Sequence, residues 1–92
     1  MAFKILFMGT PDFAVPSLKS IYQAGHKILE VYTQPPKRKN RGQKIQNSPI
    51  HEEAKKLNLK IRHPISLKEE KEIEHFVNLR PDIVVVVAYG KI

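Results

Sequence analysis

Short apolar runs alternate with amphipathic stretches along this chain of 92 residues. Residues 3–8 form an apolar run that ends at a glycine, and their length and aromatic content favour a β-strand. Over residues 13–24 the apolar side chains recur at intervals of three and four, which predicts an amphipathic helix. We expect Asp12 to cap this helix, Pro16 to lie in its first turn and Gly25 to end it.

The same alternation continues through the middle of the chain. Residues 28–33 are rich in side chains that favour strands, and they predict a second strand. After a long polar stretch, Ser48 and Pro49 are typical of a helix start, with the serine as cap and the proline at the first helical position. Residues 59–62 are a candidate for a short third strand.

The last third of the chain repeats the helix–strand pattern. Ser66 to Glu69 matches a capping box, in which two side chains satisfy each other's backbone donors at a helix start. Residues 83–87 are apolar without alternation, which is typical of a strand covered on both faces of a parallel sheet. We expect the buried stripe of the preceding helix at Ile73, Phe76, Val77 and Leu79.

The order of these elements predicts an α/β fold. Strands and helices that alternate in this way imply right-handed crossovers and a mostly parallel, doubly wound, Rossmann-like sheet of about four strands and three helices. A central strand at residues 83–87 needs neighbours on both sides, and three helices are few for both faces of such a sheet. We therefore expect residues 1–92 to be the amino-terminal part of a larger fold.

Positive charge is concentrated in residues 34–49. The formal net charge is +7, from 16 basic and 9 acidic residues, and this segment supplies five basic side chains and no acidic one. A loop of this length inside a compact chain is usually either functional or disordered. Its charge indicates a polyanionic partner such as nucleic acid, and a solvated linker explains the composition about equally well. The five basic residues are Lys37, Arg38, Lys39, Arg41 and Lys44.

The composition of this loop also indicates how it would bind. Arg41 is followed by Gly42, which places a guanidinium beside a flexible position that allows close approach to phosphate or a base edge. The loop contains no aromatic side chain, so stacking on unpaired bases is not expected. Contact with the backbone or groove of a duplex fits better.

Several classes of chemistry are disfavoured by residue content. The chain has no cysteine, which excludes disulfides, thiolate catalysis and cysteine-based zinc sites. None of its four histidines (His26, His51, His63 and His75) has another at the helical spacing of a metal pair, so no metal is expected. No segment approaches the ~20 apolar residues of a membrane span. We expect a cytoplasmic location and no membrane partner.

Ligands of open α/β sheets bind at the carboxyl ends of the strands, here residues 9–13, 33–35 and 88–90. The first segment has a single glycine, and Pro11 removes a backbone donor, which disfavours a dinucleotide site; the P-loop lysine is also missing. Asp12 is a candidate catalytic acid, but the helix-cap interpretation is favoured. We find no convincing nucleophile or general base, and thus binding surfaces without a reaction centre.

Five short motifs occur in a fixed order: residues 7–16, Thr33-Gln34-Pro35, Arg41-Gly42, Ser48-Pro49-Ile50 and residues 86–90. In their order and spacing they resemble the methionyl-tRNA formyltransferase family along the whole chain. The resemblance implies transfer of a formyl group from 10-formyltetrahydrofolate, the formyl-donor cosubstrate, to the amino group of methionine on initiator tRNA in translation initiation. It also implies a Rossmann-like catalytic domain followed by a small β-barrel that helps to hold the tRNA, and a monomer.

The resemblance also implies roles for individual residues. The basic loop would enter the acceptor stem, with Arg41 and Gly42 as the recognition motif and Lys37, Arg38, Lys39 and Lys44 as neighbours that contact the backbone. The folate pocket would be lined by Ala88, Tyr89 and Gly90. The floor near the methionyl group would be formed by Gly9, Thr10, Pro11 and Phe13.

The family's catalytic Asn, His and Asp have no match in residues 1–92, so we assign no catalytic residue and expect this part alone to be inactive. Two alternatives remain. One is a stand-alone RNA-binding module, which the local charge would suit. The other is a related folate-dependent formyltransferase with another, smaller substrate, which would have no need of the basic loop.

Overall fold

The computed structural model describes residues 2–39 and 44–90, and within them a four-stranded parallel sheet. The strand order is β5-β2-β1-β6, so the first strand pairs with both the second and the last. This arrangement confirms the predicted Rossmann-like α/β fold. The strands are β1 (Lys4–Gly9), β2 (Lys27–Tyr32), β5 (Ile61–Arg62) and β6 (Ile83–Val87).

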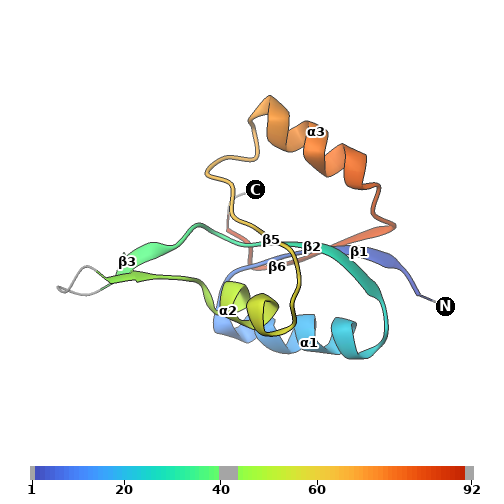
Figure 1. Ribbon diagram of the computed structural model, residues 1–92, viewed down its shortest axis with the longest axis horizontal. Helices are drawn as coiled ribbons and strands as arrows, with labels where there is room; N and C mark the ends of the chain where they lie inside the picture. The colour runs from blue at the N-terminus through green and yellow to red at the C-terminus, as the bar shows by residue number, and fades with distance from the viewer. Residues whose placement is uncertain (1, 40–43, 91–92) are drawn as a thin grey trace.

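Helices cover both faces of the sheet (Figure 1). A 3₁₀ turn, η1 (Asp12–Ala14), leads into α1 (Val15–Gln23), which lies beside α2 (Pro49–Lys56) on one face. On the opposite face lies α3 (Glu70–Leu79). No helix in the described part of the chain has the length and apolar content to cross a membrane.

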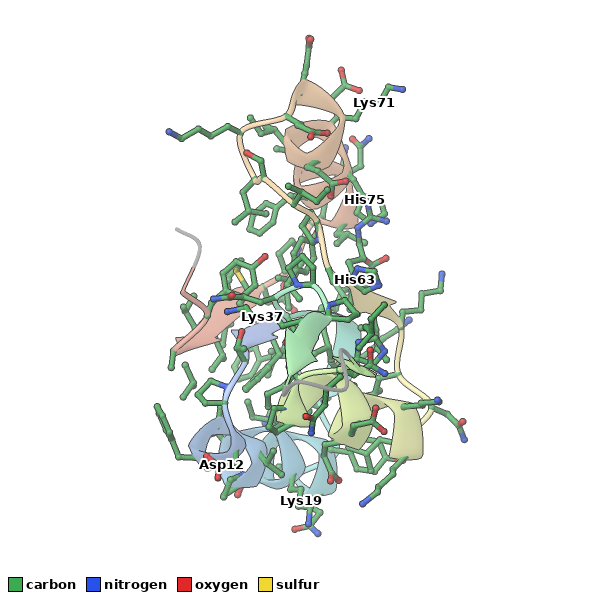
Figure 2. All side chains as sticks on the ribbon, turned by 90° about the vertical axis from the view of Figure 1, so that its left-hand side faces the viewer. Asp12, Lys19, Lys37, His63, Lys71 and His75 are labelled. Carbon is green, nitrogen blue, oxygen red and sulfur yellow. The ribbon has the colours of Figure 1, made fainter. Side chains whose placement is uncertain are left out.

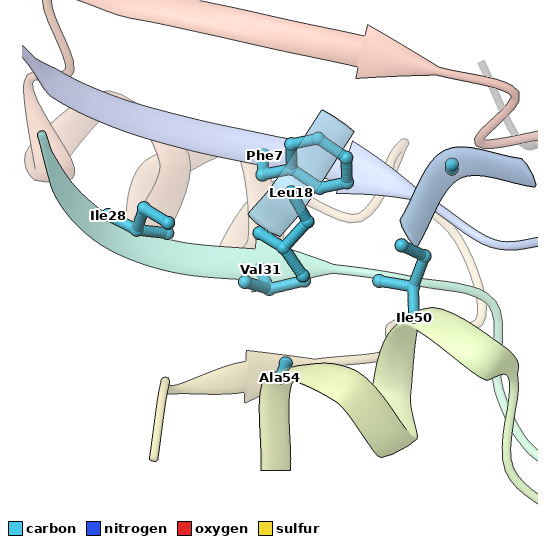
Figure 3. Close-up of a cluster of buried hydrophobic side chains, with 7 residues drawn as sticks. Phe7, Leu18, Ile28, Val31, Ile50 and Ala54 are labelled. Carbon is cyan, nitrogen blue, oxygen red and sulfur yellow. The ribbon is translucent and has the colours of Figure 1, made fainter. Parts of the chain in front are cut away.

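The main apolar core lies between the sheet and the α1–α2 layer (Figure 3). Side chains from β1 and β2 meet side chains from both helices there, and most are completely buried. Burial of each large aliphatic or aromatic side chain stabilises the fold by about 1.5–3 kcal/mol. The cluster comprises Phe7, Ala14, Leu18, Ile28, Val31, Ile50 and Ala54.

A second, smaller cluster lies on the α3 face. Phe76 and Leu79 of α3 pack with Leu67 against the buried side chains of the sheet and of the segment after β6. The buried members are Leu6, Met8, Tyr32 and Tyr89. Because Tyr89 follows β6, this second core extends to the carboxyl end of the sheet.

Three of the predicted helix boundaries are confirmed. Pro16 lies in the first turn of α1, and Gly25 follows the helix with a φ of +86°. The Ser48 side chain caps α2 by accepting a hydrogen bond from the His51 backbone N–H at 3.0 Å. The expectation for Asp12 is wrong, because it is the first residue of η1 and its side chain caps neither helical segment.

The start and the buried face of the last helix also differ from expectation. Ser66 accepts from the Lys68 N–H at 3.1 Å, which closes a local turn, and α3 begins one turn later without a side-chain cap. The predicted buried stripe is only partly right. Phe76 and Leu79 pack on the sheet, but Ile73 and Val77 are 50% and 62% exposed.

Strand β6 is not covered on both faces. Val85 and Val87 pack against the main core, whereas Val84 and Val86 are 37% and 46% exposed. Among the described residues β6 pairs only with β1 and stands at the sheet edge, while α3 packs over β1 and β2. One face of β6 is therefore packed on the core, and the other is an apolar surface that the described residues leave exposed.

The basic segment forms an element that the sequence pattern did not predict. β3 (Lys37–Lys39) and β4 (Lys44–Gln46) pair antiparallel, with Lys37 opposite Gln46. We call these two paired strands, Lys37–Lys39 and Lys44–Gln46, the basic hairpin. It forms its own two-stranded sheet and projects from the body of the molecule, beyond the carboxyl ends of β1 and β2 (Figure 1).

Candidate functional site

Three segments that are far apart in the sequence meet at the carboxyl end of the sheet, and we call this junction the strand-end site. The Thr10 hydroxyl, after β1, donates to the Tyr89 carbonyl, after β6, at 2.9 Å. The Gln34 side-chain amide, after β2, donates to the same carbonyl at 3.0 Å. The Gln34 backbone N–H donates to the Thr10 hydroxyl oxygen at 3.3 Å. These three hydrogen bonds close a triangle between the three strand ends.

The chain turns sharply around Tyr89. Ala88 and Gly90 have φ values of +52° and +90°, in the left-handed region that L residues other than glycine adopt rarely. The Tyr89 side chain is 1% exposed, and burial raises the pKa of its phenol. A Cβ added to Gly90 would collide with the Gln34 Nε2 atom. Glycine at position 90 therefore lets Gln34 approach the backbone of this turn.

The segment after β1 offers a similar close approach. An added Cβ at Gly9 would meet the Val87 carbonyl at 2.9 Å and the Phe7 ring at 2.8 Å, so glycine at position 9 gives the backbone of β6 room beside the end of β1. Phe13 is 67% exposed. Pro11, two positions earlier, is half-buried. The expected methionyl-binding residues are thus divided. Gly9 and Thr10 contact the end of β6 and the segment after it, whereas the Phe13 side chain is an exposed apolar surface.

A hollow of about 220 Å³ lies between the strand-end site and the root of the basic hairpin. Thr33 and Ser48 are joined by their hydroxyls at 2.5 Å, which ties the end of β2 to the start of α2. This bond closes the base of the segment that carries the hairpin. The hollow is lined by Thr10, Gln34, Pro35, Lys37, Gln46, Asn47, Ser48 and Pro49.

Four of the five predicted basic residues lie in the strands of the basic hairpin. Lys37 is exposed and lines the hollow. In Figure 2 it lies between Lys71, on α3 at the top, and Lys19, on α1 at the bottom. Arg38 and Lys39 belong to β3, and Lys44 begins β4. Arg41 and Gly42, the predicted recognition pair, fall between the two strands and lie outside the described residues.

A charged cluster on the α3 face was missed in the sequence analysis. Glu30 on β2 is only 5% exposed, and its Oε1 atom lies 2.8 Å from His75 Nε2 and 3.8 Å from Arg62 Nε. Arg62 Nη2 also donates to both carboxylate oxygens of Glu72, at 2.9 and 3.0 Å, and this bond raises the pKa of the guanidinium. Burial raises the pKa of the neighbouring Tyr32 to about 12. The sequence did contain a sign of this cluster, because Glu30 is an acidic residue within an otherwise apolar predicted strand.

Two histidines that lie twelve positions apart come together beside α2. The rings of His51 and His63 stack with centroids 5.6 Å apart and an interplanar angle of 23°. Burial, and then the charge of His63, lower the pKa of His51. The described residues contain no group of three or more potential metal ligands. The pair is therefore a packing contact that disfavours protonation.

A parallel sheet in the order β5-β2-β1-β6, with helices on both faces, defines the class of Rossmann-like α/β proteins. Within that class, the chain belongs to the formyl transferase family, whose pattern it matches over residues 3–92. The resemblance noted from the motifs is thereby confirmed.

Several relatives with curated names are methionyl-tRNA formyltransferases. That of Sulfurihydrogenibium sp. (strain YO3AOP1) is 53% identical over 90 residues, which are 97% of this chain and 29% of the relative. That of Mesorhizobium japonicum is 50% identical over 91 residues, 98% of this chain and 29% of the relative. That of Roseobacter denitrificans is 46% identical over 89 residues, with 97% and 29% covered. The chain thus spans about 29% of the length of these relatives.

Proposed function

We propose that this chain is the amino-terminal part of the catalytic domain of a methionyl-tRNA formyltransferase. In this proposal the remainder of the enzyme supplies the catalytic residues and a carboxyl-terminal tRNA-binding barrel. The complete enzyme transfers a formyl group from 10-formyltetrahydrofolate to the amino group of methionine on initiator tRNA, as a cytoplasmic step of translation initiation. It works as a monomer and without a metal.

One observation carries the proposal: the root of the basic hairpin opens onto the strand-end site through a shared hollow. A nucleic acid held by the hairpin would therefore have its end close to the carboxyl edge of the sheet, where ligands of this fold class bind. The names and high identity of the relatives support the same assignment of substrate.

In the proposed reaction, two of the strand-end segments face different substrates. Tyr89, with Ala88 and Gly90, would form one wall of the folate pocket, largely through its backbone turn. The segment from Gly9 to Phe13 would face the methionyl group. The methionine amine attacks the formyl carbon and a new C–N bond forms. The bond from the formyl carbon to the folate nitrogen breaks, the amine gives up one proton, and the folate nitrogen takes up one. Residues 1–92 would bind and orient, and they are assigned no proton transfer.

The basic hairpin would hold the tRNA. Its lysines and arginines neutralise phosphates and release counterions, which gives attraction that weakens steeply with salt. Arg41, with Gly42 beside it, is assigned the principal recognition role, because a guanidinium can donate two parallel hydrogen bonds to phosphate or a base edge. Lys37, Arg38, Lys39 and Lys44 would contact the phosphate backbone around it.

Formylation of methionyl-tRNA by the full-length enzyme tests the proposal. We expect Arg41→Ala to raise the KM for initiator tRNA while leaving that for 10-formyltetrahydrofolate nearly unchanged. Equal loss of both would remove the role assigned to Arg41. A full-length enzyme that cannot formylate methionyl-tRNA at all would refute the proposed function itself.

A further inference from the structure

Gln34 connects two parts of the molecule that the proposed function assigns to different substrates. Its backbone lies at the root of the basic hairpin, three residues before β3 begins at Lys37. Its side-chain amide reaches the Tyr89 carbonyl, 55 positions further along the chain, at 3.0 Å. Gln34 therefore contacts the predicted folate-binding turn with one end and continues into the predicted tRNA-binding element with the other.

The connection from Gln34 to the hairpin is stiff. Pro35 and Pro36 are the only residues between Gln34 and Lys37, and each proline fixes its φ near −65°. Consecutive prolines form extended, semi-rigid spacers. Displacement of the first hairpin strand is therefore transmitted to Gln34 instead of being absorbed by a flexible linker.

At the other end of the connection, the turn at Tyr89 and Gly90 contains one peptide whose orientation can vary. The Tyr89 side chain is 1% exposed and fixed in the second apolar cluster, whereas Gly90 has no side chain and a φ of +90°. The peptide that links Tyr89 to Gly90 is therefore the part of the turn whose orientation the surroundings must determine. Only two side chains donate to its carbonyl among the described residues, those of Gln34 and Thr10. A Cβ at Gly90 would occupy the position of the Gln34 amide.

We propose that Gln34 is a positioning residue that couples the two substrate sites. This inference rests on the proposed function. Initiator tRNA on the basic hairpin fixes the hairpin root, and through Gln34 it holds the Tyr89–Gly90 peptide in the orientation that folate requires. Folate then binds to a segment that is already ordered and loses less conformational entropy on binding. Linkage requires the reverse effect to be equal, so folate must tighten tRNA binding by the same factor.

Binding measurements on the full-length enzyme test the coupling without any turnover. Tetrahydrofolate, which has no formyl group to transfer, is titrated by calorimetry with and without saturating uncharged initiator tRNA. The reciprocal titration measures tRNA affinity with and without tetrahydrofolate. In the wild type we expect each ligand to tighten the other by the same factor, on the order of 5-fold or more.

Gln34→Leu removes the amide donor and keeps a side chain of similar size. We expect the coupling factor of this variant to fall to about one, whatever the change in the two separate affinities. A merely structural role would instead lower both separate affinities or the melting temperature and leave the factor unchanged. Should Gln34→Leu fail to fold, Gln34→Asn serves in its place, because it keeps the amide but is one methylene too short to hold this hydrogen bond.

Gln23→Leu is the matched control. Gln23 is exposed at the end of α1 and makes the same chemical change possible away from the site. It should keep the wild-type coupling factor. A Gln34→Leu variant with the wild-type factor, or a wild type that binds both ligands without mutual effect, would overturn the coupling alone. A wild type that binds neither ligand would instead remove the proposed function, and the coupling with it.

Discussion

The Nε2 atom of His75 lies 2.8 Å from the Oε1 atom of Glu30, which joins α3 to a carboxylate that is 5% exposed within the sheet. Helix α3 is therefore held by polar contacts through Glu72 and His75 as well as by the apolar contacts of Phe76 and Leu79. Because no side chain of α3 is fully buried, we infer that the polar contacts supply much of its attachment.

Replacement of Glu30 by glutamine should destabilise the protein. The change keeps the size of the side chain but removes the charge that faces His75 and Arg62. Each of these partners is about one-third exposed, so water compensates part of the loss. We expect the free energy of unfolding to fall by about 1–2 kcal/mol, measured by urea denaturation.

Glu74→Gln is the matched control for this prediction. Glu74 is exposed on the same helix as His75, and its replacement should change the free energy of unfolding by no more than about 0.5 kcal/mol. Equal effects of the two substitutions would show that the buried Glu30 contact does not hold α3.

Ser48 and Ser66 allow a direct comparison of two serines that the sequence presents alike. Ser48→Ala removes a real helix cap and also leaves the Thr33 hydroxyl without its bond to Ser48. We expect a loss of about 1–2 kcal/mol in the free energy of unfolding. Ser66→Ala removes only a local turn contact and should cost clearly less. Thermal melts of both variants measure the difference, and a larger loss for Ser66→Ala would contradict the assignment of the caps.

The two serines also show how far the sequence determines this fold. Both motifs satisfy the local chemistry of a cap, but only Ser48 is followed by a residue, Ile50, that the main core buries completely. The parallel sheet and most helix positions follow from apolar spacing, which is a local property. The start of α3 does not, because its position depends on where Phe76 and Leu79 can reach the sheet.

The candidate site was predicted only in part for a similar reason. Its segments could be named because strand ends are visible in the sequence, and Thr10, Tyr89 and Gly90 are indeed brought together. The contact of the Gln34 side chain with the Tyr89 carbonyl could not be seen, since the two residues are 55 positions apart. The hairpin pairing within the basic segment was also missed, because a stretch so rich in charge resembles a linker.

Acidification should reveal the His51–His63 contact. Because the pKa of His51 is lowered in the folded protein, the unfolded chain takes up a proton first as the pH falls through about 6.5. The contribution of His51 to stability is therefore complete above this pH and is lost as the pH falls toward the folded pKa.

His51→Phe tests this pH dependence, since phenylalanine keeps a planar ring against His63 but cannot be protonated. The free energy of unfolding, measured by urea denaturation between pH 7.5 and pH 5, should fall less steeply for the variant than for the wild type. Above pH 7.5 the difference between the two proteins should be constant. Parallel curves across the whole range would show that His51 does not titrate differently in the folded and unfolded states.

Lys37 should contribute to tRNA binding through its charge alone. It is exposed on the first strand of the basic hairpin and borders the hollow that leads to the strand-end site. Loss of one phosphate contact lowers the slope of log affinity against log salt concentration by about 1 and weakens binding similarly for all sequences. We therefore expect Lys37→Ala in the full-length enzyme to bind initiator tRNA more weakly at low salt, with a shallower salt dependence in filter-binding assays.

Lys19→Ala is the control for this prediction. Lys19 lies on the exposed surface of α1 and away from the hairpin, so its replacement should leave both the affinity and its salt dependence unchanged (Figure 2). If the two variants showed the same salt dependence, the hairpin would not be the surface on which the tRNA backbone binds.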